Sequence, residues 1–289
     1  MKKFWTVIKE TFSGWSKDNS SMFAAALSFY TFFSLAPLLL IAVAIAGLVF
    51  GKEAVQGQVV QQISVLIGKQ GSGVIQDMLI HTQKQPSASI FATIIGFATL
   101  LLGASAVFLQ LQSALNIVWG IRPDESGGGI WGTIKKRVLS FGLVLSLGFL
   151  LLVSLLISAA LSAFNSYLSG LFPGADVLLF ILNFVISLGI ITIFFALIFK
   201  YLPDVVDIEW RDVWVGAFIT SLLFTIGKFL IGFYLGSSGV SSTYGAAASI
   251  VVILLWIYYA SQIILLGAEF TKFYAISYGS RRSLEDRKV

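Results

Sequence analysis

The chain has 289 residues, of which 57% are hydrophobic and only 11% are charged. Soluble domains carry roughly 25% charged residues, so the composition excludes a water-soluble globule and indicates a polytopic membrane protein. The absence of cysteine excludes thiolate chemistry, and the single histidine, His81, excludes a histidine-based metal cluster. The formal net charge of +5 would suit nucleic acid, but the placement of the basic residues points to membrane topology instead.

Six apolar stretches are each long enough to form a helix across about 30 Å of hydrocarbon, which needs about 20 residues. They lie at residues 22–50, 88–118, 138–168, 177–201, 212–235 and 246–274. No cleavable signal peptide is expected, because the first 20 residues are amphipathic. The sequence therefore predicts an all-α fold, with one transmembrane domain of six spanning helices over residues 1–289.

The basic residues separate by side of the membrane. The N-terminus, the 2–3 loop, the 4–5 loop and the C-terminal end together hold 15 Lys and Arg, whereas the 1–2 loop holds three and the two remaining loops none. Short cytoplasmic loops retain positive charge. We therefore expect both termini in the cytoplasm.

Two further segments are amphipathic rather than spanning. Residues 1–20 place aromatic and aliphatic residues on one helical stripe opposite lysines, which is typical of a helix lying in the headgroup layer. Residues 51–86 carry two apolar stripes separated by Lys69-Gln70-Gly71-Ser72-Gly73, which predicts a helical hairpin on the outer face. This hairpin could be a lid over a site or a passive cap. Residues 278–289 are expected to form a flexible basic tail.

Several kinds of catalytic chemistry are excluded by missing residues. The chain has no Gly-x4-Gly-Lys-Ser/Thr run, no His lies within a predicted span, and the one Asp there, Asp212, is the first residue of its span. The carboxylates are scattered along predicted cytoplasmic edges, which does not suit a metal-dependent nuclease. We expect no catalytic residues, no metal, no cofactor and no nucleic-acid partner. Lys135-Lys136-Arg137 is more simply a topology determinant.

Lys228 is the one basic residue well inside a span, since Lys200 and Lys272 lie within two residues of a span end. A charge near the bilayer centre costs roughly 2.5–3.5 kcal/mol, so such residues usually face a cavity or a partner. Asn183 is predicted at a similar depth, and span three adds a polar stripe. We interpret Lys228, Asn183, Tyr234 and this stripe as candidates for lining a substrate cavity. The stripe consists of Ser154, Ser158, Ser162 and Asn165. Alternatively, the serines pack helices and Lys228 extends to the outer interface.

A second group of residues consists of gate or structural candidates. Glu269 lies near the inner interface, as an inner-gate carboxylate or as the partner of Lys272. Pro37 should kink the first span. Gly47/Gly51 and Gly232/Gly236 are small-xxx-small pairs that permit close helix approach. The remaining candidates of this group are Tyr30, Asn116, Asp204 and Trp256.

Several motifs in order resemble the YihY/virulence factor BrkB family of bacterial inner-membrane proteins, formerly labelled ribonuclease BN. They are Ala24-Ala25-Ala26-Leu27-Ser28-Phe29-Tyr30, Ser34-Leu35-Ala36-Pro37-Leu38-Leu39, Leu111-Gln112-Ser113-Ala114-Leu115-Asn116 with Trp119, Leu202-Pro203-Asp204, Trp214-Val215-Gly216-Ala217, Tyr244-Gly245, Leu255-Trp256-Ile257-Tyr258 and Leu265-Leu266-Gly267-Ala268-Glu269. The resemblance implies six helices with cytoplasmic termini, and roles in envelope or lipid transport or in resistance to host killing. The ribonuclease label conflicts with the missing chemistry, and we reject it.

The leading functional hypothesis is a transporter or flippase-like protein. It would move an amphiphilic, anionic molecule such as a lipid or envelope precursor, with membrane lipids as its partners. The alternative is a non-transporting scaffold in envelope maintenance or virulence, whose helix surfaces and basic edges recruit other proteins. The substrate, energy source and oligomeric state do not follow from the residues.

The charge separation makes a prediction about topology. A single cysteine at Ser72 should react with an impermeant maleimide in intact cells whose outer membrane is permeabilised, and one at Ser283 should not. Labelling is read by mass shift on a gel. The reverse pattern would place the termini outside.

Overall fold

The computed structural model describes residues 2–83, 106–121, 142, 175–204, 208–237, 244 and 247–281. In these ranges every regular element is a helix, and the predicted all-α fold is confirmed to that extent. The elements are α1 (Lys2–Lys17), α2 (Ser20–Phe50), α3 (Lys52–Gln83), α6 (Ala175–Tyr201), α7 (Trp210–Ser237) and α9 (Ala248–Ser277), with a further helix at Ala106–Val118.

Three of the described helices are long and apolar enough to cross a membrane: Ile181–Tyr201, Trp210–Tyr234 and Ala248–Ser277, in α6, α7 and α9. Two shorter apolar helices cover Ser20–Leu35 and Ala106–Val118. The helices α2, α6, α7 and α9 occupy four of the stretches in which spans were predicted. Most of the 88–118 and 138–168 stretches lies outside the described residues, so the total of six spans stays a prediction.

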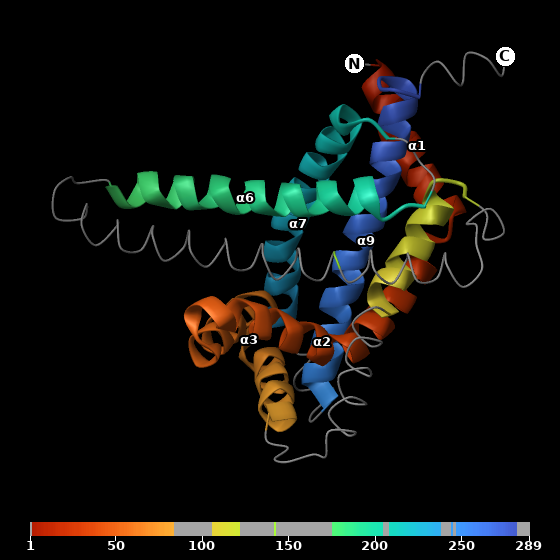
Figure 1. The fold of residues 1–289 in the computed structure, drawn as a ribbon. Helices are drawn as coiled ribbons and strands as arrows, with labels where there is room; N and C mark the ends of the chain where they lie inside the picture. Colours follow the sequence, from red (N-terminus) through yellow and green to blue (C-terminus); the bar gives the residue numbers. More distant parts are fainter. Residues whose placement is uncertain are drawn as a thin grey trace.

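The helix α9 is the centre of the assembly and contacts α1, α2, α3 and α7. In Figure 1, α7 runs beside α9, and α6 crosses α7 so that its N-terminal half extends away from the other helices. At the crossing, Phe195 of α6 packs edge-on against Phe224 of α7, with ring centroids 5.7 Å apart. The beginning of α1 and the end of α9 lie at the same end of the molecule (Figure 1).

The helices α7 and α9 interlock through two Gly-x-x-x-Thr motifs. A Cβ on Gly216 of α7 would overlap the Thr271 hydroxyl of α9, and a Cβ on Gly267 of α9 would overlap the Thr220 hydroxyl of α7. Each threonine hydroxyl also donates a 2.7 Å hydrogen bond to the carbonyl of the glycine one turn earlier in its own helix. The two antiparallel helices therefore touch backbone to side chain, and both threonine hydroxyls are satisfied within their own helices.

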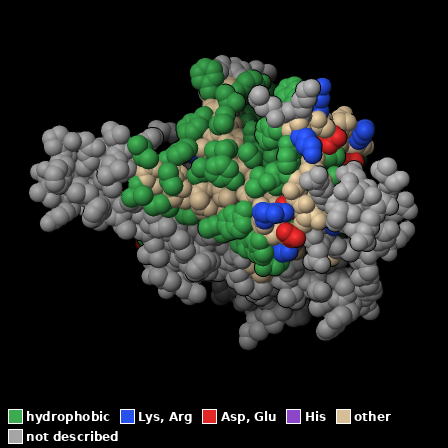
Figure 2. Space-filling view, turned by 90° about the horizontal axis from the view of Figure 1, so that it is seen from above, with side chains coloured by type: hydrophobic (Ala, Val, Ile, Leu, Met, Phe, Trp, Pro, Cys, Tyr) green, Lys and Arg blue, Asp and Glu red, His purple; other side chains and the backbone are tan. Residues whose placement is uncertain are grey.

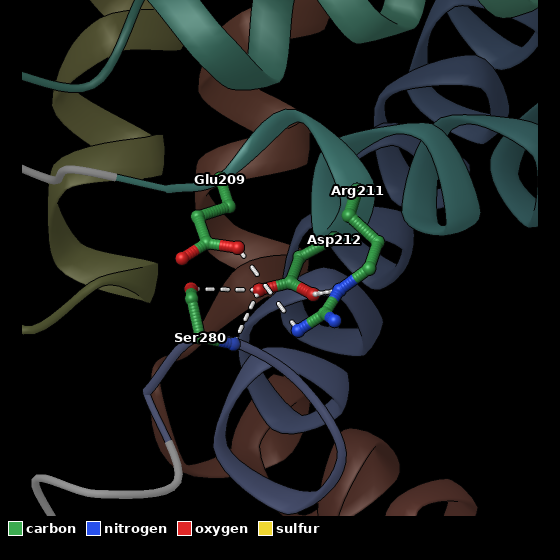
Figure 3. A network of polar contacts seen from close by, with 4 residues as sticks. All are labelled: Glu209, Arg211, Asp212 and Ser280. Atoms are coloured by element: carbon green, nitrogen blue, oxygen red, sulfur yellow. Dashed lines mark hydrogen bonds and ion pairs between the residues drawn. The ribbon is translucent and has the colours of Figure 1, made fainter.

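The same pair of helices is joined at one end by a carboxylate (Figure 3). Asp212, fully buried in the first turn of α7, accepts hydrogen bonds from the Ser280 amide at 2.8 Å and the Ser280 hydroxyl at 2.7 Å. Arg211 Nε lies 3.7 Å from the other carboxylate oxygen, and Gly279 leaves room for it. The start of the predicted flexible tail, 278–281, is therefore ordered against α7.

The predicted hairpin differs in detail from the structure. The structure has one helix, α3, across residues 52–83, so the expected break at Lys69-Gln70-Gly71-Ser72-Gly73 does not end the helix. Residues from both halves, such as Gln56 and Gln76, line one cleft of about 620 Å³, and α3 changes direction along its length (Figure 1). Because Ser72 is buried, exposed Gln61 is the better labelling position for the topology test.

Another expectation concerned close approach at Gly232. Among the described residues, a Cβ on Gly232 would have nothing within 4 Å, so Gly232 itself makes no close helix contact there. The close approach occurs instead at Gly216 and Gly267, whose partners are threonines.

Gly216→Ala should destabilise the protein by about 1–3 kcal/mol, because the added methyl group cannot be accommodated without separating α7 from α9. The expected result is a lower thermal unfolding midpoint in detergent. Gly232→Ala on the same helix is the matched control and should leave the midpoint unchanged, since its Cβ meets none of the described residues within 4 Å.

A compensating variant tests the cause. Combining Gly216→Ala with Thr271→Gly moves the small residue to the other helix and should recover part of the lost stability, less about 1 kcal/mol for glycine in a helix. No recovery in the double variant would show that the interlock is not the source of the effect.

Candidate functional site

A buried polar stripe runs along α7. Ser221, Thr225 and Lys228 are spaced by four and three residues, which puts them on one face of the helix. Ser221 is fully buried and Thr225 is 8% exposed. The Ser221 hydroxyl shares a 2.8 Å hydrogen bond with the hydroxyl of Thr192 on α6. A row of hydroxyl groups thus lies between the crossing with α6 and Lys228.

Lys228 lies on the packed side of α7. It is half-buried, and its Nζ lies 5.1 Å from the Phe229 ring centroid. One turn earlier on the same face, Phe224 packs edge-on against Trp256 of α9, with centroids 6.0 Å apart. Among the described residues, no carboxylate forms an ion pair with Lys228.

Lys228 was grouped with other residues in the predicted cavity, and the structure separates two of them. Asn183 is exposed on α6, nine residues before Thr192 and so on the opposite face of that helix. Tyr234 lies on α7, but about 120° around the helix from Lys228. The Asn183 and Tyr234 side chains therefore do not extend the polar stripe. Four others lie outside the described residues: Ser154, Ser158, Ser162 and Asn165.

Glu269 belongs to a separate charged cluster between α9 and α1. Its side chain is fully buried and lies 3.6 Å from Lys272 Nζ, which also lies 3.6 Å from Asp18. A Cβ on Gly14 of α1 would be 2.7 Å from a Glu269 carboxylate oxygen. Within the described chain, neither Glu269 oxygen has a hydrogen-bond donor. Lys272 Nζ thus lies between the carboxyl groups of Glu269 and Asp18, at the contact of α9 with the end of α1.

This cluster lies well away from Lys228. The α7–α9 register sets Gly227 against Tyr259, so Glu269 is ten residues, or about 15 Å, further along α9. The two charged sites are separate, and a direct ion pair between them is excluded.

Asn116 and Asp204 form a second polar node. Asn116 donates to the Asp204 carboxylate at 2.7 Å and accepts from the Asp204 backbone amide at 3.0 Å. Gln112 donates to the other carboxylate oxygen at 3.1 Å and to the Leu202 carbonyl at 2.9 Å. These bonds attach the Ala106–Val118 helix to the connection that follows α6. A gate at this node would have to break several bonds at once.

The other structural candidates are placed as follows. Tyr30 is 43% exposed and packs edge-on against Phe29, so it lies on an outer surface of α2. The helix α2 continues without interruption through Pro37. The indole Nε1 of Trp256 is buried with no acceptor among the described residues.

Charged side chains are unevenly distributed over the surface. Figure 2 shows them in a few groups, while hydrophobic side chains cover much of the remaining described surface. Near the end of α9, Arg281 stacks over the Trp119 ring at 5.4 Å. Within the described ranges, His, Asp and Glu do not gather in a group of three that could hold a metal ion.

Four residues of these polar sites were not predicted from the sequence: Thr192, Ser221, Thr225 and Gln112. A count of polar residues at helical spacing within α7 would have identified Ser221 and Thr225, which share a face with Lys228. Thr192 carried no such signal, because its partner is on another helix. Gln112 lies one turn before Asn116 inside a motif already noted, so the shared face was available.

The chain was compared with known proteins. A family model, virulence factor BrkB, matches residues 11–288. Relatives include UPF0761 membrane proteins of Verminephrobacter eiseniae, 32% identical over 265 residues, and of Albidiferax ferrireducens, 31% identical over 267 residues. These matches cover 89% and 88% of this chain, but only 59% and 58% of the relatives. No solved structure matches. The chain therefore belongs to the virulence factor BrkB family of membrane proteins.

Proposed function

We propose that this protein moves an anionic amphiphile, such as a lipid or an envelope precursor, across the bacterial inner membrane. The observation that carries the proposal is the position of Lys228 at the end of the buried polar stripe of α7. A lysine within an apolar helix is costly unless it faces a partner or a cavity. A headgroup phosphate or carboxylate is the partner that its charge and position suit.

The polar stripe suggests how such a substrate moves. Its headgroup would leave water and exchange hydration for the hydroxyls of Ser221 and Thr225 and for the Lys228 ammonium group. The acyl chains would stay in the surrounding hydrocarbon, where they need no polar partner. The protein then lowers the barrier by binding the one part of the lipid that the bilayer excludes.

The topology that we propose has six spans and both termini in the cytoplasm. It is supported by the division of 15 basic residues against three and by the shared location of the start of α1 and the end of α9 (Figure 1). Lys228 would then lie nearer the outer surface and Glu269 nearer the inner one.

A scaffold role is the competing proposal. The N-terminal half of α6 exposes Ile181, Phe184 and Val185, which gives an apolar surface that a partner helix could cover. A scaffold needs neither the charge nor the position of Lys228, so the next experiment distinguishes the two functions.

Lys228→Met should insert and fold normally but lose most lipid movement, because the methionine keeps the length of the side chain without the charge. Lys228→Arg should keep part of the activity, since the charge remains while its geometry changes. The measurement is the loss of protection of inner-leaflet fluorescent phosphatidylglycerol from a membrane-impermeant quencher, in liposomes containing the purified protein.

Lys3→Met, at an exposed position on α1, is the matched control for removal of a lysine and should be fully active. Full activity of Lys228→Met would contradict the binding role of the ammonium group. Absence of lipid movement by the wild type across a panel of anionic and zwitterionic lipids would favour the scaffold.

A further inference from the structure

Glu269 is a fully buried carboxyl group that the proposed lipid movement does not use. It lies in α9 about 12 Å before the last residue of the helix, Ser277. The helix α1 packs along α9 (Figure 1). At Gly14 the α1 backbone itself covers the carboxyl group, because a Cβ there would be 2.7 Å from a Glu269 oxygen. The group is therefore enclosed between two helices.

The charged groups beside Glu269 do not balance. Lys272 Nζ lies 3.6 Å from a Glu269 oxygen and 3.6 Å from an Asp18 oxygen. Two carboxyl groups thus share one ammonium group. If both were ionised, this contact would carry a net negative charge, and one of the two negative groups would be completely buried.

The helices that pack on α9 bring no second cation within ion-pair distance. Next to this part of α9, α7 presents Gly216 and Thr220, and α2 contains no Asp, Glu, Lys, Arg or His. The helix α3 packs near Ile253, toward the other end of α9. On α1, Glu10 is half-buried and Lys17 is exposed. Among the described residues, Glu269 is therefore within 4.0 Å of one ammonium group only.

An ionised Glu269 would lack the partners that a buried carboxylate needs. Within the described chain, neither of its oxygens has a hydrogen-bond donor. A carboxylate in such a position is costly, and the group takes up a proton instead. A metal cation would need several oxygen ligands and would be repelled by Lys272. A proton needs no coordination shell, so it is the ion that this site suits.

The site also has a route to its surroundings. The side chains of Lys272 and Asp18 are 21% and 27% exposed. Asp18 precedes the first predicted span, which begins at residue 22. A proton can therefore reach the cluster at the turn between α1 and α2, without crossing the bilayer.

We propose that Glu269 is a proton-binding site, which is occupied at neutral pH while α1 packs on α9. Release of the proton leaves a carboxylate that needs water or another donor, and this requires the α1 backbone at Gly14 to move away. Proton binding and the packing of α1 are thus linked, and higher pH favours the separated helix. The proposal does not rest on lipid movement, because Lys228 takes no part in it.

Infrared spectroscopy of the full chain in liposomes near neutral pH tests the bound proton. Subtracting the spectrum of Glu269→Gln from that of the wild type should leave the C=O band of a protonated carboxyl group. Asp18→Asn is the matched control, since Asp18 contacts the same ammonium group but is partly exposed. Its difference spectrum should contain the bands of an ionised carboxylate.

Cysteine labelling tests the link to α1. Thr11 is 4% exposed, whereas Ser13 is exposed on the same helix. The ratio of the maleimide reaction rates of Thr11→Cys and Ser13→Cys cancels the titration of the thiol itself. Between about pH 5 and about pH 9, the range that buried carboxyl groups reach, this ratio should rise with pH. The rise should be at most about tenfold per pH unit, because one proton is involved.

The same ratio should stay low and constant when Glu269→Gln is added, since glutamine is neutral at every pH. Asp18→Asn should keep the dependence on pH. A difference spectrum without a protonated carboxyl band, or a constant ratio in the chain with Glu269 intact, would overturn the proposal. High labelling of Thr11→Cys at every pH in Glu269→Gln would also overturn it, by showing that an ion pair with Lys272 holds α1. Lipid movement is tested separately through Lys228→Met.

Discussion

Gly216 and Gly267 allow α7 and α9 to approach until each receives a threonine hydroxyl from the other helix. Lipid supplies no hydrophobic force that drives helices together, so this contact relies on shape and on hydroxyls that are satisfied within their own helices. Other helices pack against this pair. The helix α6 crosses α7 at Thr192 and Ser221, and α1 packs on α9 at Glu269.

In the close α7–α9 pair, the polar residues and the exposed apolar residues of α7 lie on different faces of the helix. One face of α7 carries Ser221, Thr225 and Lys228 toward its packed side, and the face turned away from Lys228 carries the exposed residues Ile226 and Leu230. A single helix thus presents a polar stripe to its neighbours and an exposed apolar surface on the other side.

The charges near the ends of the helices have a different use from Lys228. Asp212 holds Ser280, Asp204 holds Asn116 and Gln112, and Lys272 links Glu269 to Asp18. Each carboxylate connects segments that are distant in sequence. These contacts fix how the helices meet, whereas Lys228 has no carboxylate partner among the described residues.

Hydropathy by itself determined the positions of α2, α6, α7 and α9, because about 20 apolar residues in lipid must form a helix that satisfies its own backbone. It also identified Lys228 and Glu269 as charges inside apolar segments. Only the tertiary structure decided their neighbours. Asn183 and Lys228 share a predicted depth but lie on helices that cross, and depth carries no information about direction around a helix axis. Likewise, α7 approaches α9 closely at Gly216 rather than at Gly232 because Thr271 of α9 lies opposite Gly216.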